Sequence, residues 1–298
     1  SAGTSSLGAT SGANLDASAL LLGNGGTGGG ILHYVGQGEV TDRKIRLNTT
    51  TGSTEIHASG AGPLVLTNLA NDLVGGAKSL YLRGSNAGGN AVTGVLADNG
   101  GALAVVIDGA ASWILDNPLN TLTGNITANG GALGVGADAA LGTGGLVLGS
   151  ASVFAFGGDR VLANIPQISN NTGVAFVGDH AFTFTQPLAL RASANSVGLT
   201  NNLPAGKPLV FPAVTVNDID ANGRAWNIGG SGDTVVSGDI TTTKTFAFVI
   251  NYSGTGSLTL GGTGSNTNGG ALNVTNGTLR LGADGVLANL LAGLSLVT

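Results

Sequence analysis

The chain has 298 residues and a formal net charge of −5; 9% of its residues are charged, 42% are hydrophobic and 54 are Gly. Its 11 Lys and Arg residues are spread along the chain without a basic patch, which argues against nucleic acid and anionic membrane surfaces as partners. The absence of Cys excludes disulfides and Cys-based metal sites, and no apolar run is long enough for a membrane-spanning helix.

Short runs of alternating apolar and polar residues recur along the whole chain. Period-two alternation places the apolar side chains on one face of a strand. Gly, Asn or Asp follows nearly every run and supplies a corner. No helical period persists over three turns, so the sequence predicts an all-β protein. In chain order, the predicted strands before the C-terminal repeat are 44–47, 64–66, 80–82, 105–107, 146–148, 154–156, 174–176, 182–184, 188–190, 214–216, 226–228 and 246–248.

An internal repeat shows how the corners are used. Residues 258–288 hold alternating runs at 258–260, 272–274 and 279–281, separated by turns of Gly, Asn and Thr. Residues 120–142 align without a gap on residues 266–288. The identical pairs are Asn120/Asn266, Thr121/Thr267, Gly124/Gly270, Gly131/Gly277, Leu133/Leu279, Gly136/Gly282, Ala137/Ala283, Asp138/Asp284 and Leu141/Leu287. A repeat that turns the chain the same way each time predicts the coils of a parallel β-solenoid.

This repeat resembles the passenger-associated repeat of bacterial autotransporters, in which Asn-Thr, a Gly, a strand, Gly-x-Leu, a second strand and Gly-x-Asp follow in order. Residues 30–62 resemble another recurrent stretch of such proteins, through Tyr34-Val35-Gly36, Thr41-Asp42-Arg43 and Ala58-Ser59-Gly60. The family usually has an aromatic residue after Asn-Thr, where this chain has Leu122 and Asn268. The resemblance implies a right-handed parallel β-helix at the bacterial cell surface or in the extracellular space, and it implies no enzymatic activity.

We expect one elongated rod that covers residues 1–298, because a solenoid adds coils without splitting into domains. Coils of ~20–25 residues would give roughly 12–15 coils. Aromatic residues gather between 154 and 252, which predicts the widest core there. The Pro residues at 187, 204, 208 and 212 fall between predicted strands, where a missing ladder donor does little harm.

Carboxylate clusters are candidate catalytic sites, since parallel β-helices also include polysaccharide lyases and glycosidases. Asp218 and Asp220, near Arg224, would project from one face of a strand, as the paired carboxylates of glycoside hydrolysis require. The surrounding VNDIDANGR favours an Asx-rich turn instead. Asp179-His180 has no identifiable nucleophile beside it and predicts a polar corner. We therefore predict no catalytic residue and no enzyme.

The remaining polar motifs predict neither a cofactor nor a metal. The Gly-rich turn at 23–30 indicates a close backbone approach, but it lacks the Lys-Ser/Thr and the helix of a phosphate loop. GGSGDTVVSG, residues 229–238, approaches a GGxGxD calcium corner, yet Asp233 comes one position early and the motif is not tandem. His33 and His57 are expected to face outward or to be hydrogen-bonded rather than to ligate a metal. The many Asn and Thr side chains suit ladders that hydrogen-bond along the coil axis.

The C-terminal segment is the predicted place of self-association. Leu287, Leu290, Leu291 and Leu294 have the spacing of an amphipathic helix, whereas the resemblance favours a strand that begins near Leu294. An apolar terminal strand without a polar cap is expected to meet another coil. That coil would belong either to a longer chain or to a second subunit stacked head to tail. The first alternative is open because the sequence has neither an initiator Met nor a signal peptide, and we interpret it as a mature product or an excised segment. The predicted contact residues are Leu290, Leu291, Leu294, Leu296 and Val297.

Two classes of function remain open. The first, which we favour, is a structural protein of the cell surface or extracellular space: a stiff solenoid building block of a stalk, surface layer or filament. The second is an adhesin that binds glycans or host surfaces through a lateral face. The chain has two Trp and three Tyr, which gives little support for an aromatic binding face.

Overall fold

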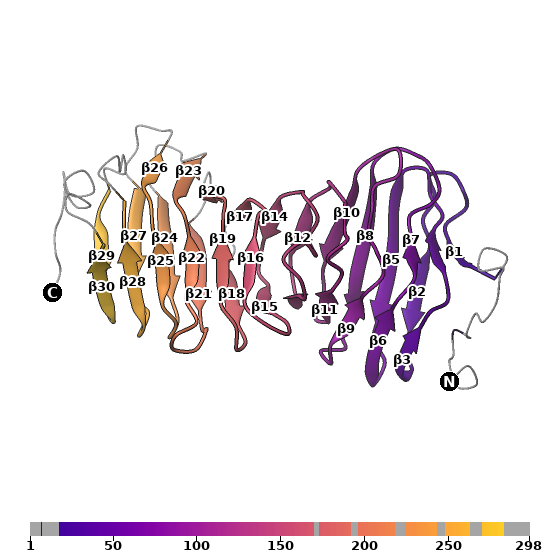
Figure 1. Ribbon diagram of the computed structural model, residues 1–298, viewed down its shortest axis with the longest axis horizontal. Helices are drawn as coiled ribbons and strands as arrows, with labels where there is room; N and C mark the ends of the chain where they lie inside the picture. The colour runs from indigo at the N-terminus through magenta and orange to yellow at the C-terminus, as the bar shows by residue number, and fades with distance from the viewer. Residues whose placement is uncertain are drawn as a thin grey trace. The chain divides into compact units, whose positions relative to one another are not determined.

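The computed structural model confirms an all-β protein (Figure 1). It describes Leu7 and residues 18–169, 173–191, 196–217, 224–242, 248–262 and 270–282. Every regular element in these ranges is a strand. None of these residues belongs to a helix with the length and apolarity needed to cross a membrane. The chain forms two compact units, Ser1–Leu146 and Val147–Thr298, and each is a β-solenoid.

The first unit has three sheets, and the chain visits them in turn. One sheet consists of β1 (Leu20–Leu22), β4 (Ile45–Leu47) and β7 (Leu69–Ala70). The second contains β2 (Ile31–Tyr34), β5 (Gly52–Ala58), β8 (Lys78–Gly84), β10 (Leu103–Ile107) and β12 (Ile126–Ala128). The third contains β3 (Gln37–Thr41), β6 (Gly62–Leu66), β9 (Asn90–Val92), β11 (Ser112–Leu115) and β13 (Ala132–Val135).

The second unit repeats this plan. β14 (Leu146–Leu148) leads into it. One of its sheets contains β17 (Pro166–Ile168), β20 (Leu188–Arg191), β23 (Val214–Asn217) and β26 (Ile240–Thr242). Another contains β15 (Ser152–Ala155), β18 (Gly173–Val177), β21 (Val197–Asn201), β24 (Arg224–Gly229), β27 (Phe248–Tyr252) and β29 (Leu272–Val274). The last contains β16 (Arg160–Leu162), β19 (Phe182–Phe184), β22 (Leu209–Phe211), β25 (Thr234–Val236), β28 (Ser257–Leu260) and β30 (Thr278–Leu281).

Strands of successive coils pair in parallel, and the residue step from one coil to the next varies. Ser112 pairs with Ala132, a step of 20 residues, whereas Val197 pairs with Trp226, a step of 29 residues. The chain makes about ten turns, so the expected 12–15 coils were too many. The described strands run from Leu20 to Leu281, and some coils are longer than the ~20–25 residues of a compact repeat, so fewer coils are formed than 298 residues would allow.

Inward side chains form the core because the register aligns apolar positions. Ile56 pairs with Leu82 and Leu82 with Ile107, and all three are fully buried. In the second unit, the Phe184 and Phe211 rings stack with centroids 5.2 Å apart, and Phe176 packs edge-on against both Phe182 and Phe184. Most aromatic residues of the later coils therefore fill the interior, and the expectation of the widest core there stays a prediction.

The alternation at 154–156 predicts that Phe154 and Phe156 face inward, and this prediction is wrong. β15 ends at Ala155, and its inward residues are Val153 and Ala155. Val153 pairs with the buried Phe176 of the next coil, and this register turns Phe154 outward. Phe156 follows the strand and is 46% exposed. In a run of three apolar residues, either the outer two or the middle one can face inward, and packing on the neighbouring coil decides which.

The internal repeat forms the same pair of strands in both copies where residues 270–282 of the second copy are described. The first copy gives β12 and β13, and the second gives β29 and β30, joined by Gly131 with φ +58° and by Gly277 with φ +72°. The buried Asn120 that opens the first copy accepts a hydrogen bond from the Leu96 N–H and donates one to the Ala140 carbonyl. This motif residue thus links three successive coils.

The expected amide ladder is present in the second unit. Asn251 donates to the Asn227 side-chain oxygen at 2.8 Å, and Asn273 donates to that of Asn251 at 2.8 Å. These residues share one register column of β24, β27 and β29. The Pro residues at 187, 204, 208 and 212 lie between strands, as predicted.

Candidate binding surface

The outer face of β5 and β8 carries an unusual concentration of functional groups. These two strands have seven residues each, the longest among the described strands, and they pair over their full length. Because side chains alternate, Ile56 and Leu82 point into the core while their neighbours point outward. Within this register, Glu55 lies beside Tyr81 and His57 beside Arg83. The group that we call the polar patch consists of His33, Glu55, His57, Tyr81, Arg83 and Asp108.

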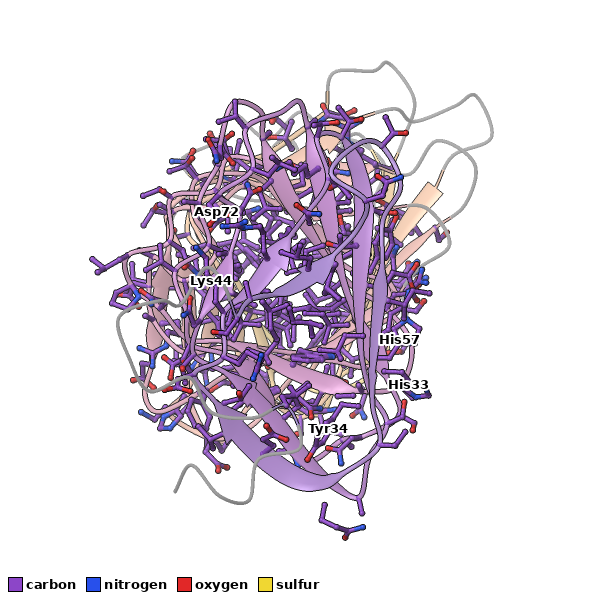
Figure 2. All side chains as sticks on the ribbon, turned by 90° about the vertical axis from the view of Figure 1, so that its right-hand side faces the viewer. His33, Tyr34, Lys44, His57 and Asp72 are labelled. Atoms are coloured by element: carbon purple, nitrogen blue, oxygen red, sulfur yellow. The ribbon has the colours of Figure 1, made fainter. Side chains whose placement is uncertain are left out.

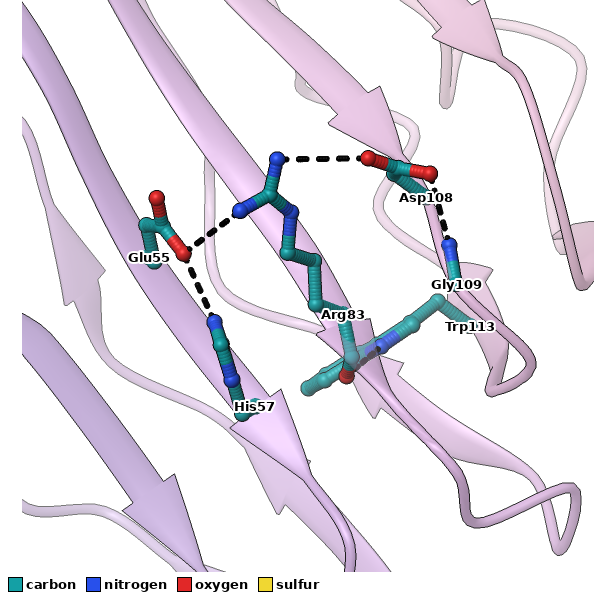
Figure 3. Close-up of polar contacts among 6 residues, drawn as sticks. All are labelled: Glu55, His57, Arg83, Asp108, Gly109 and Trp113. Carbon is teal, nitrogen blue, oxygen red and sulfur yellow. Dashed lines mark hydrogen bonds and ion pairs between the residues drawn. The ribbon is translucent and has the colours of Figure 1, made fainter.

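Ion pairs join the polar patch across successive coils (Figure 3). Arg83 donates one hydrogen bond to Glu55 Oε2 at 2.8 Å and another to Asp108 Oδ2 at 3.2 Å. His57 Nε2 lies 2.7 Å from the same Glu55 oxygen. The Trp113 indole N–H donates to the Arg83 carbonyl at 3.0 Å, which fixes the backbone beneath the guanidinium. One cation thus bridges β5 and the residue that follows β10.

Aromatic rings complete the polar patch. The Arg83 guanidinium lies over the Tyr81 ring, 4.5 Å from its centroid. His33 of β2 pairs in register with His57 of β5, and their rings meet edge-on at 5.8 Å. Figure 2 shows both His side chains outside the wall of the first unit. Rings and ion pairs therefore hold one another in place on a surface that water still reaches.

The electrostatics of the polar patch favour the ionised form of Glu55. The hydrogen bond with His57 lowers the pKa of Glu55; burial opposes this shift, and the charge and hydrogen bond of Arg83 add to it. Side-chain exposures of 21% for Glu55 and 32% for Arg83 leave this pair partly solvated. Such pairs contribute about 0–1 kcal/mol each to stability. The polar patch can therefore both accept and donate hydrogen bonds.

A second charged cluster lies on the opposite wall of the same unit (Figure 2). Asp72 pairs with Lys44 at 2.5 Å and with Arg46 at 2.6 Å. Burial alone would raise the pKa of Asp72, but Arg46 and Lys44 hold it below its ordinary value. The buried Lys78 donates to the Asn71 side chain at 2.7 Å and to the Leu73 carbonyl, and burial lowers its pKa. These bonds anchor the connection from β7 to β8.

Several sequence-predicted site residues have structural partners. His57 is hydrogen-bonded and His33 is exposed, as expected. Asp233 accepts hydrogen bonds from the backbone and the hydroxyl of Ser257 on the next coil. His180 lies 3.6 Å from Asp159, so Asp179-His180 belongs to a polar corner, as predicted. Within the described ranges, no three His, Cys, Asp or Glu side chains are grouped as a metal site would require.

Other predicted residues lie outside the described part of the chain. They are Asp218, Asp220, and the self-association set Leu290, Leu291, Leu294, Leu296 and Val297. The backbone of Arg224 begins β24, and its side chain is not described. The head-to-tail contact at the C-terminal segment therefore stays a prediction.

Sequence reasoning missed the association of Glu55, Arg83 and Asp108. These residues are separated by steps of 28 and 25 positions, and no fixed period in the sequence relates them. The available signal was compositional. In a chain with three His and 9% charged residues, two His and both Glu residues of the chain fall within residues 33–57.

The parallel β-solenoid defines the class of protein, and one comparison with known proteins finds a similarity to an autotransporter adhesin, without testing the repeat type. A stretch of 115 residues is 35% identical to the adhesin BmaC autotransporter of Brucella suis biovar 1 (strain 1330). The stretch covers 37% of this chain and 3% of that protein, so the chain spans a small fraction of this curated relative. No known protein family matches the chain, and no solved structure matches it.

Proposed function

We propose that this chain is a non-enzymatic β-solenoid segment of an adhesin-like passenger protein, located at the bacterial cell surface or in the extracellular space, where it acts as a stiff spacer. The observation that carries this proposal is the stack of parallel coils with a continuous apolar interior in each unit. The similarity to an autotransporter adhesin supports the location.

Stiffness follows from how the coils are joined. Each coil packs on its neighbours, and backbone hydrogen bonds between coils run along the stacking direction. Buried side chains such as Asn120 reinforce the corners by bonding to the coils before and after them. Bending the stack would break several of these bonds at once. The non-enzymatic part of the proposal rests on the polar patch, whose carboxylates pair with Arg83 and His57.

Labelling of cells tests the location. Antibodies raised against the purified chain should label intact cells of the organism that makes it, and external protease should remove the label. Permeabilised cells serve as the control for total protein. Labelling that appears only after permeabilisation would overturn the proposal.

A second candidate function is head-to-tail association, as in a filament. The observation that favours it concerns Leu281 of β30, which is 43% exposed although its register partner Leu260 is 2% exposed. A further coil stacked on β30 would cover this inward-facing side chain. That coil would come from the same polypeptide or from another subunit. If it comes from another subunit, the contact joins two different ends, and repeating it without forming a closed ring generates a filament.

Electron microscopy of the purified 298-residue chain at low and high concentration distinguishes these cases. Self-association predicts filaments that become longer as the protein concentration rises. The substitution Leu281→Lys should make these filaments shorter. Val235→Lys, at a half-buried outward position of β25, is the matched control. Separate particles at every concentration would refute self-association and favour a segment of a longer surface protein.

A further inference from the structure

The polar patch stands out from the other outward surfaces of the described chain. Outward positions on the second unit's strands are mostly Ala, Val, Thr and Asn, as in the register column Val161, Thr183, Val210, Val235 and Thr259. The polar patch instead gathers two of the three His, one of the three Tyr, and three charged residues over the successive strands β2, β5, β8 and β10. Four strands at ~4.8 Å spacing span about 14 Å, enough to lie along a short oligosaccharide.

The polar patch keeps unused hydrogen-bonding groups beside its internal ion pairs. Glu55 uses Oε2 for both His57 and Arg83, while Oε1 has no partner among the described residues. The same holds for the Tyr81 hydroxyl, His57 Nδ1 and both ring nitrogens of His33. These groups are held in fixed positions by the ring contacts and ion pairs, so a ligand would not have to order them.

The charge distribution selects the kind of ligand. Arg83 directs its two terminal nitrogens at Glu55 and Asp108, and its Nε is buried without a partner. Because both terminal nitrogens already donate to carboxylates, Arg83 offers a sulfate or carboxylate no pair of unengaged nitrogens. The polar patch carries two carboxylates, Glu55 and Asp108, against the single guanidinium of Arg83. Uncharged hydroxyls can bond to Glu55 Oε1, to the Tyr81 hydroxyl and to the imidazoles, and the exposed His33 ring can cover the C–H face of a sugar.

We propose that the polar patch is a binding site for a neutral, hydroxyl-rich glycan. This inference deepens the proposed adhesin-like function and rests on it. His33 supplies a ring contact, the Tyr81 hydroxyl and Glu55 form hydrogen bonds with sugar hydroxyls, and Arg83 positions Glu55 and Tyr81 without touching the ligand.

A glycan microarray that carries neutral, sialylated and sulfated oligosaccharides tests the proposal with the purified chain. We expect binding to neutral glycans, with at least tenfold weaker binding for His33→Ala and for Tyr81→Ala at an unchanged melting temperature. Thr215→Ala, an outward change on β23 of the second unit, is the matched control and should bind normally. The exposed position of His33 keeps the test valid if Tyr81→Ala unfolds.

Three results would overturn the site: binding to no glycan, binding to anionic glycans alone, or binding that His33→Ala leaves intact. Cell labelling separates this failure from that of the proposed function. Intact cells that are labelled while the array stays blank would refute the site and leave the surface location standing. Absence of surface label would refute the location whatever the array shows.

Discussion

At the scale of single residues, Asn120 shows why the repeat motif begins with Asn. Its amide satisfies the Leu96 N–H and the Ala140 carbonyl, both in buried surroundings, at 2.7 Å each. An amide carries its donor and its acceptor on separate atoms, so it can donate to one neighbouring coil and accept from the other. Leu122, two positions later, is fully buried and takes the place where the autotransporter repeat usually has an aromatic residue.

We predict that Asn120→Ala lowers the free energy of unfolding by about 2–4 kcal/mol, because each buried group left unpaired costs about 1–3 kcal/mol. Urea titration followed by circular dichroism measures the change. Thr121→Ala, at the exposed neighbouring position, is the control and should be nearly neutral. Equal losses for the two variants would show that the inter-coil bonds of Asn120 are unimportant.

Acid should weaken the polar patch through Glu55. The His57 hydrogen bond, aided by Arg83, lowers the pKa of Glu55 in the folded chain below its ordinary value of 4.5. Ionised Glu55 therefore contributes stability above about pH 4.5 that is lost as pH falls through the lowered pKa. Melting temperatures from pH 7 to pH 3 should fall more steeply for wild type than for Glu55→Gln. Parallel curves would contradict this role.

At the scale of elements, the corner between two strands depends on Gly. Gly131 joins β12 to β13 with φ +58°, and a Cβ there would lie 2.1 Å from the Ala111 carbonyl oxygen of the previous coil. Gly277 occupies the matching corner between β29 and β30, with φ +72° and the Gly254 carbonyl oxygen at 2.3 Å from a Cβ. Close stacking and the left-handed backbone both require a missing side chain.

Gly131→Ala should cost at least about 1–2 kcal/mol from the left-handed backbone alone, with a further loss from the clash. Gly173→Ala is the matched control, because Gly173 begins β18 and a Cβ there meets nothing within 4 Å. Thermal and urea unfolding of both variants measure the difference. A corner that tolerates Ala at Gly131 without loss would mean that neighbouring coils can move apart.

At the scale of the whole molecule, a solenoid should tolerate loss of one complete coil. Val105 pairs with Ile126 and Ser112 with Ala132, so deletion of residues 105–125 brings equivalent positions onto the preceding coil. We predict a folded protein with the same β-sheet circular dichroism and a modestly lower melting temperature, because interfaces between neighbouring coils add independently. Deletion of residues 105–115 alone, about half a coil, is the control and should prevent folding. Loss of structure in both deletions would refute a modular stack.

Much of the fold could be predicted, since strand formation here is a local property. The alternating runs at 80–82 and 182–184 became parts of β8 and β19 with the expected face inward. The run at 154–156 failed because three residues alone do not define an inward face, and Phe176 on the next coil decided it. The polar patch could not be predicted, because its residues meet through the register of β5, β8 and β10.

The sequence by itself determined the class of structure. Period-two alternation, Gly corners and the repeat at 120–142 specify strand, turn and strand within a few residues, and such short-range steric and hydrophobic preferences act in any context. Only the tertiary structure decided how many residues make a coil, from 20 to 29, and hence which outward side chains become neighbours. The physical reason is that a coil closes where its apolar residues stack on those of the coil before it. That condition joins residues about 25 positions apart, so no local pattern contains it.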